Sequence, residues 1–216
     1  MKISLEQHLR DYAASFYNGQ PENDRNIRLK IDHTFRVRDE ARRIAAAELP
    51  DPAERSLAER AALLHDLSRF EQFARFGTFK DAASFDHGDR SAELAAEQHL
   101  LDNLDEAAQA DVLDAIRSHN KLAIPGTLSE RGTVLAQVVR DADKIDILRV
   151  NVETPMEEIY NVSTAALRRS PVTPAVLDAF LDAVFSHAEG PVSVKTRLGV
   201  SSPDEFAAIL DIYDRY

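Results

Sequence analysis

The chain has 216 residues, of which 44% are hydrophobic, and its formal net charge at pH 7 is −11. This length suits one domain with a substantial core and is short for two independent domains. The acidic balance argues against a nucleic-acid polymer as partner, because proteins that track a phosphate backbone normally carry a basic patch. With zero cysteines there are no disulfides, and any bound metal must be held by nitrogen and oxygen atoms.

The sequence predicts neither a transmembrane helix nor a signal peptide. Charged residues interrupt every apolar run before it reaches the length of a transmembrane helix. The segment Met1–His8 lacks the apolar core of a signal peptide. We therefore expect a cytoplasmic protein with no membrane partner.

The first predicted helix covers about Ser4 to Asn18. Its apolar residues, including Leu5 and Leu9, recur every three or four positions and so share one face. Ser4 is a plausible N-cap, with Gln7 in the capping-box position three residues later. We expect this helix to pack on the core.

A second helix is predicted from about Asp24 to Glu48. His33 lies on the same apolar face as Val37 and Ala41. A single histidine on such a face is more often hydrogen-bonded within the core than bound to a metal. His33 is therefore a strong candidate ligand only if partners exist elsewhere in the chain.

The pair His65-Asp66 ends a third predicted helix, about Asp51 to His65, after four small or apolar residues. Imidazole and carboxylate are both metal-ligand types, and a buried carboxylate has to be paired or coordinated. Neighbours on a helix point about 100° apart, but at a helix end the second side chain can turn back toward the same ion. In the alternative interpretation, Asp66 caps the next turn while His65 packs in the core.

The segment 67–84 is predicted to be a loop with at most a short helix. Phenylalanines recur every third residue, among them Phe70, Phe73 and Phe79. Such a stripe is more often core than binding surface. The alternative is that part of it contacts a nucleobase, a sugar or another organic group.

Two histidines follow at the boundaries of further predicted helices. His87 precedes a helix of about Gly88 to Leu101, and His119 ends a helix of about Asp105 to His119. Both are candidate ligands at helix ends.

The helix from about Ser129 to Val150 is apolar around much of its circumference, so we expect it to be central and buried. Asp143 lies within it and is the candidate final ligand. Asp141 is predicted to face outward. Asp146, one turn after Asp143, could orient a ligand.

The remainder of the chain is less informative. Helices are expected near residues 156–162, 174–187 and 203–213, and the stretch 191–195 could be extended. We predict an N-terminal helix in residues 1–20, a metal-binding core in 21–150 and a helical extension of the same domain in 151–216.

The order of these residues resembles the HD superfamily of metal-dependent phosphohydrolases. In that family a histidine, a His-Asp pair and a final aspartate bind metal, and a two-metal branch adds two histidines between the pair and the final aspartate. The resemblance covers roughly residues 27 to 149 and implies an all-α fold. It implies the ligand set His33, His65, Asp66, His87, His119 and Asp143.

The resemblance also implies a chemistry. Asp66 would bridge two ions and hold the nucleophilic hydroxide between them. Arg69 occupies a position where some family members have a basic residue that contacts the scissile phosphate, and Lys144 could assist it. The cofactor would be one or two divalent ions, such as Mn, Fe, Co, Ni, Zn or Mg.

The sequence therefore predicts a phosphohydrolase that acts on a small nucleotide or another phosphorylated metabolite. Hydrolases of symmetrical dinucleoside tetraphosphates share the ligand order, so they stay among the alternatives. Two other classes stay open. One is a non-catalytic regulator that binds metal or nucleotide, and the other is a di-iron oxygenase on the same fold. A homodimer is compatible with the sequence, although no self-complementary stripe indicates one.

Overall fold

The computed structural model describes residues 3–155 together with 159, 163, 165 and 182. The described residues contain helices and no strand, so the prediction of an all-α fold is confirmed. The chain divides into two compact units, Met1–Asn161 and Val162–Tyr216, and the site lies in the first. The elements predicted between residues 156 and 213 lie outside the described residues, and the predicted division at residues 20 and 150 stays a prediction.

The helices of the first unit follow one another with short connections. They are α1 (Leu5–Ala14), α2 (Pro21–Glu48), α3 (Pro52–Leu64), α4 (Arg69–Phe76), α5 (His87–Glu97), α6 (Glu106–Ser118) and α7 (Glu130–Glu153), with a 3₁₀ turn at Asp81–Ala83. Most begin and end within a few residues of the predicted positions. The helix α4 is the short helix expected within the segment 67–84.

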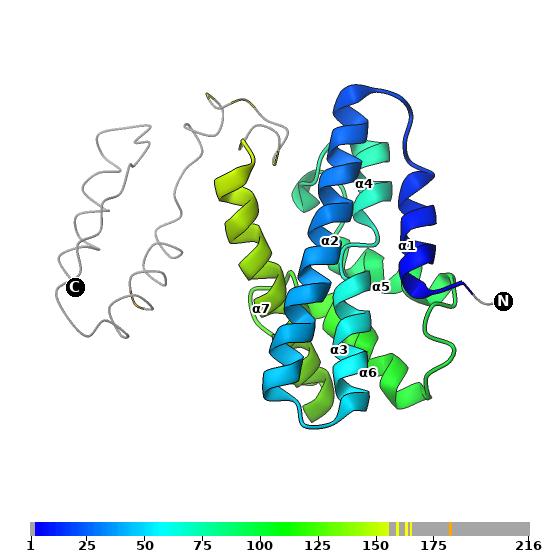
Figure 1. Cartoon of the computed structure of the whole chain (residues 1–216), viewed down its shortest axis with the longest axis vertical. Coiled ribbons are helices and arrows are strands. Elements are labelled where there is room, and N and C mark those ends of the chain that lie inside the picture. Colours follow the sequence, from blue (N-terminus) through cyan, green and yellow to red (C-terminus); the bar gives the residue numbers. More distant parts are fainter. Residues whose placement is uncertain (1–2, 156–158, 160–162, 164, 166–181, 183–216) are drawn as a thin grey trace. The chain divides into compact units, whose positions relative to one another are not determined.

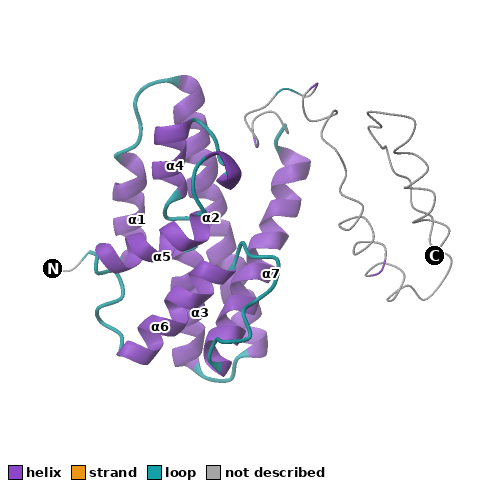
Figure 2. Ribbon diagram, turned by 180° about the vertical axis from the view of Figure 1, so that it is seen from behind, coloured by secondary structure: helices purple, strands orange, loops and turns teal. Residues whose placement is uncertain are grey.

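The two long helices α2 and α7 pack against each other, and each also packs on α3 (Figure 1). The helix α6 lies on the other side of α7 and contacts α3 and α5. The short helices α1 and α4 pack on α2, and α5 and α6 pack on α3, as the view from the opposite side shows (Figure 2). This arrangement directs the middle of two long helices and several helix ends toward one point.

Side-chain caps fix where several helices begin. The serine or aspartate before α1, α3, α5, α6 and α7 accepts a hydrogen bond from a backbone N–H of the first turn. Ser4 caps α1 as predicted, through Gln7 N at 3.1 Å. The side chain of Gln7, however, donates to Asp11 Oδ1 at 2.8 Å, so the reciprocal half of a capping box is missing.

Small residues dominate the contacts between these helices. Alanines on α2, α3, α5, α6 and α7 are fully buried: Ala41, Ala45, Ala58, Ala61, Ala62, Ala92, Ala95, Ala115, Ala136 and Ala142. Because helix axes approach more closely when the contact side chains are small, this core holds the backbones near one another. Polar side chains from different helices can therefore meet inside the unit.

The helix α7 is less uniformly buried than predicted. Leu135, Val138 and Val139 in its first half are buried, but Ile145 is 46% exposed and Leu148 is 69% exposed. The apolar residues of the second half are spread over two faces, and α2, α3 and α6 cover only part of the circumference. Among the described residues, no helix combines the length and the apolar character that crossing a membrane would require.

Candidate metal centre

The structure brings all six predicted ligands together inside the first unit. His33 lies in the middle of α2 and Asp143 in the middle of α7. His65 and Asp66 follow the last residue of α3, His119 follows the last residue of α6, and His87 is the first residue of α5. All six residues are buried, with exposed fractions of 6% or less.

Three of these residues form what we call the first cluster: His33, His65 and Asp143. Their ligand atoms lie close enough to surround one ion. His33 Nε2 is 3.2 Å from Asp143 Oδ1, and His65 Nε2 is 3.9 Å from the same oxygen. Donor atoms that share an ion at bonds of about 2.1 Å are separated by distances of this kind.

His87 and His119 form the second cluster. Their Nε2 atoms are 3.0 Å apart. Gly88 allows this approach, since a Cβ there would lie 2.6 Å from Asn120 Oδ1 and 3.0 Å from Arg117 O. A side chain at residue 88 would therefore force the Asn120 side chain and the end of α6 to shift.

Asp66 lies between the two clusters. Its Oδ2 faces the first cluster, 3.5 Å from His33 Nε2 and 3.6 Å from His65 Nε2. Its Oδ1 faces the second, 3.6 Å from His87 Nε2 and 3.8 Å from His119 Nε2. The side chain does not cap α4, because Ser68 is the N-cap residue of that helix. One carboxylate oxygen is thus available to each cluster.

Every one of these imidazoles is oriented through Nδ1. His65 and His119 donate from Nδ1 to backbone carbonyls, Ala62 O and Ile116 O, each at 2.7 Å. In both cases the carbonyl lies three residues back, at the end of the preceding helix.

Carboxylates orient the other two rings. His33 Nδ1 donates to Asp146 Oδ2 at 2.7 Å, which agrees with the predicted orienting role of Asp146. His87 Nδ1 donates to Asp81 Oδ2 at 2.5 Å. Each acceptor fixes the orientation of its ring, so that Nε2 is the nitrogen that faces the centre.

Two observations show that these residues fit a metal ion. His65 Nε2 is buried and has no hydrogen-bond partner, which is costly for a polar atom unless something coordinates it. The Nε2 atoms of His87 and His119 lie 3.0 Å apart, and because each ring donates from Nδ1 neither Nε2 has a hydrogen for the other, so a cation beside them would stabilise the arrangement. The donor set of imidazole nitrogens and carboxylate oxygens suits a divalent transition metal.

The histidines differ in their affinity for protons. Burial lowers the pKa of His65 and lowers that of His119 well below its usual value. Burial also acts to lower the pKa of His33, but hydrogen bonds with Asp143 and Asp146 outweigh it and the pKa is raised. His65 and His119 therefore offer neutral rings at pH 7, whereas an ion at His33 would take the place of a proton.

Both ligand carboxylates are ionised. Burial acts to raise the pKa of Asp66, but the positive charges of Lys30 and Arg69 outweigh it and hold the pKa well below its usual value. Burial opposes ionisation of Asp143 as well, and there the hydrogen bond from His33 lowers the pKa. The centre is therefore ready for a cation without losing carboxylate protons.

Two cationic side chains flank Asp66. Arg69 Nε approaches Oδ1 at 3.4 Å, and Lys30 Nζ donates to Oδ2 at 2.8 Å. The sequence interpretation identified Arg69 but missed Lys30. The signal was available, because Lys30 lies three residues before His33 and so shares its helix face.

A cavity of about 340 Å³ opens next to the centre, a size in the range of small-molecule sites. Its wall contains His33 and three cationic residues, Lys30, Arg69 and Lys80. The rest of the lining is Leu29, Phe79, Ile147, Val150, Asn151 and Ile159.

The other candidates lie differently. Lys144 is 59% exposed and donates to Asp143 Oδ2 at 3.0 Å, but it does not line this cavity. Asp141 is exposed as predicted. Of the phenylalanine stripe, Phe70 and Phe73 are buried core residues, whereas Phe79 faces the cavity.

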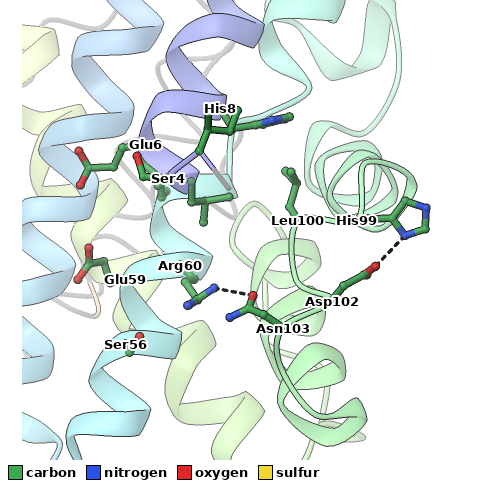
Figure 3. A pocket seen from close by; sticks show the side chains of 13 residues that line it. Ser4, Glu6, His8, Ser56, Glu59, Arg60, His99, Leu100, Asp102 and Asn103 are labelled. Atoms are coloured by element: carbon green, nitrogen blue, oxygen red, sulfur yellow. Dashed lines mark hydrogen bonds and ion pairs between the residues drawn. The ribbon is translucent and has the colours of Figure 1, made fainter. Parts of the chain in front are cut away.

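A larger hollow, about 990 Å³, lies between the start of α1, α3 and the segment after α5 (Figure 3). None of the six candidate ligands lines it. Its polar side chains pair locally, Arg60 with Asn103 at 3.2 Å and His99 with Asp102 at 3.1 Å. We therefore place the functional site at the smaller cavity.

Comparison with known proteins identifies the family of the chain. A family model for the HD domain matches residues 31–148, more than half of the chain. The chain belongs to the HD domain family. No curated protein matches it. An HD-domain protein of known structure, a predicted HD superfamily hydrolase from an uncultured Thermotogales bacterium, is 23% identical; the match covers 97% of this chain and 89% of that one, with a TM-score of 0.45.

Proposed function

We propose that this HD-domain protein is a metal-dependent phosphohydrolase that cleaves a phosphate ester or anhydride of a small nucleotide or another phosphorylated metabolite. The observation that carries the proposal is the position of Asp66. One of its oxygens faces each histidine cluster, and the cationic cavity adjoins the first cluster.

The residues that would hold the metal are His33, His65 and Asp143 with Asp66 Oδ2, and His87 and His119 with Asp66 Oδ1. A bound divalent ion would lower the pKa of a water molecule and withdraw charge from phosphoryl oxygens. The buried Nδ1 contacts of the imidazoles keep the ligand atoms in place before any ion arrives, which reduces the reorganisation needed on binding.

The cavity supports a phosphorylated substrate. Lys30, Arg69 and Lys80 would bind the anionic phosphoryl group, and the cations beside Asp66 keep that group next to the metal ligands. The Phe79 ring and the apolar residues Ile147 and Val150 would contact an organic substituent.

The proposal is tested by elemental analysis of protein purified without chelator, followed by phosphate-release assays on a panel of phosphorylated metabolites under nitrogen and under air. We expect bound divalent metal, and oxygen-independent hydrolysis that is lost in Asp66→Ala. Bound iron with turnover only in air would favour the oxygenase. Absence of metal after reconstitution with Mn or Fe would overturn the metal centre and favour the binding regulator.

A further inference from the structure

Arg69 contacts two of the atoms that would bind an ion in the second cluster. Its Nη2 donates to His87 Nε2 at 3.1 Å, and its Nε approaches Asp66 Oδ1 at 3.4 Å. The guanidinium therefore already contacts two of the three ligand atoms of this cluster.

The contact with His87 excludes an ion at the same atom. A carboxylate oxygen has two lone pairs, so Asp66 can accept a hydrogen bond and bind a metal at once. An imidazole nitrogen has one lone pair. Because Nδ1 of His87 donates to Asp81, Nε2 holds the only lone pair of the ring. A metal at His87 must displace Arg69.

The guanidinium is firmly held in this position. Its Nη1 donates to Gln72 Oε1 and to Phe79 O, both at 2.6 Å, and to Asp81 Oδ1 at 2.9 Å. Gln72 is fully buried and is itself bonded to Asp81. Since a guanidinium keeps its charge at any ordinary pH, deprotonation cannot relieve the competition.

The first cluster has no comparable competitor among the described residues. Lys30 contacts that side of the centre through Asp66 Oδ2, an oxygen that can accept a second partner. His65 Nε2 has no hydrogen-bond partner at all. An ion can enter there without displacing a cation from an imidazole.

We propose that Arg69 is an internal competitor of the second metal ion. The first cluster then binds one ion tightly, and the second cluster binds an ion only when Arg69 is displaced from His87. This inference rests on the metal centre of the proposed function and concerns how many ions that centre holds.

The test is calorimetric titration of metal-free protein with Mn²⁺, supported by elemental analysis and by the electron paramagnetic resonance signal of spin-coupled Mn²⁺ pairs. In the wild type we expect one tight ion and a second that binds at least about tenfold more weakly. In Arg69→Ala the second ion should bind roughly tenfold to a hundredfold more tightly, as expected from the loss of a charged hydrogen bond to its ligand. The spin-coupled signal should then appear at lower Mn²⁺ concentration.

Arg75→Ala is the matched control. Arg75 lies on the same helix, its side chain is 60% exposed, and it pairs with Glu71 rather than with the centre. It should leave both affinities unchanged. Arg69→Gln, which removes the charge but keeps a polar side chain, repeats the test if the alanine variant does not fold.

The outcomes separate this inference from the proposed function. Two ions of equal affinity in the wild type, or a weak second ion that Arg69→Ala and Arg69→Gln do not strengthen, would overturn the competition and leave the metal centre intact. Binding of neither Mn²⁺ nor Fe²⁺ to the wild type would overturn the metal centre, and the competition with it.

Discussion

The two clusters on either side of Asp66 use the same kinds of ligand but are built differently. The first takes His33 and Asp143 from the middle of α2 and α7, the two long helices that pack together. The second takes both of its histidines from helix ends. Arg69 is bonded to an imidazole of the second cluster only. The difference teaches that the residue types of a ligand set do not determine how many metal ions bind. A neighbouring cationic side chain can occupy the lone pairs that an ion would need.

The largest expected effect comes from removing the residue that both clusters share. Asp66→Ala should abolish metal binding in both clusters and reduce hydrolysis roughly a thousandfold or more, comparable to losing a principal electrostatic group in an active site. Elemental analysis and phosphate release measure the two effects. Retention of a full metal complement would show that Asp66 does not link the clusters.

Gly88→Ala should break the second cluster alone. The new Cβ would collide with Asn120 Oδ1 and Arg117 O and push α5 away from the end of α6. Misplacing His87 in this way should weaken the second ion about a hundredfold, and the overpacking should lower the free energy of unfolding by about 1–3 kcal/mol.

Gly126→Ala is the control for that variant, because a Cβ at residue 126 meets nothing within 4 Å. Titration and thermal melting of both variants would show whether the close approach matters. Loss of the first ion in Gly88→Ala would mean that the clusters are not separable.

Substituting the carboxylates that orient the imidazoles should change metal affinity less than removing a ligand, and in one cluster at a time. Asp146→Asn should weaken the ion of the first cluster about tenfold to a hundredfold, as is usual when a hydrogen-bond partner of a ligand is lost. Asp81→Asn should weaken the ion of the second cluster, because Asp81 accepts the hydrogen bond that orients His87.

The exposed Asp141 on α7 gives a control, and Asp141→Asn should change neither affinity. Stepwise titration with Mn²⁺ assigns each effect to one binding event. Equal weakening of both ions by either variant would contradict independent orientation of the two clusters.

The smallest expected effect concerns the cavity. Lys80 is an exposed residue of the lining, so its charge is well solvated. Lys80→Ala should raise KM for the phosphorylated substrate a few-fold and leave kcat unchanged, since it removes substrate binding and not a metal ligand. A fall in kcat at constant KM would place Lys80 closer to the reacting group than the structure does.

Much of the centre could be predicted because its ligands are polar residues within apolar helical patterns. His33 and Asp143 lie on buried faces of helices whose periodicity is clear, and the pair His65-Asp66 follows an unbroken apolar run. Burial of such groups is costly without a partner, so the pattern itself indicates a site.

The remainder depends on contacts that periodicity does not encode. Asp81 reaches His87 from a 3₁₀ turn, in a segment whose three-residue repeat of phenylalanines fits either a loop or a helix. In the sequence, Lys30 resembles an ordinary solvated lysine, and only the structure shows that it contacts Asp66. Ile145 is exposed although α7 was expected to be buried. A helical pattern shows which residues are apolar, but it does not show how many neighbouring helices cover them.

Two of the imidazoles are held by main-chain carbonyls at the ends of α3 and α6, Ala62 O and Ile116 O. The last carbonyls of a helix lack hydrogen-bond partners within the helix. Each ring supplies one of these missing hydrogen bonds, and the same bond orients the ring. No side-chain substitution can delete such an acceptor, which makes half of the orienting contacts resistant to point mutation. Anyone transplanting this centre into another scaffold would have to copy where two helices stop, and not merely which residues they carry.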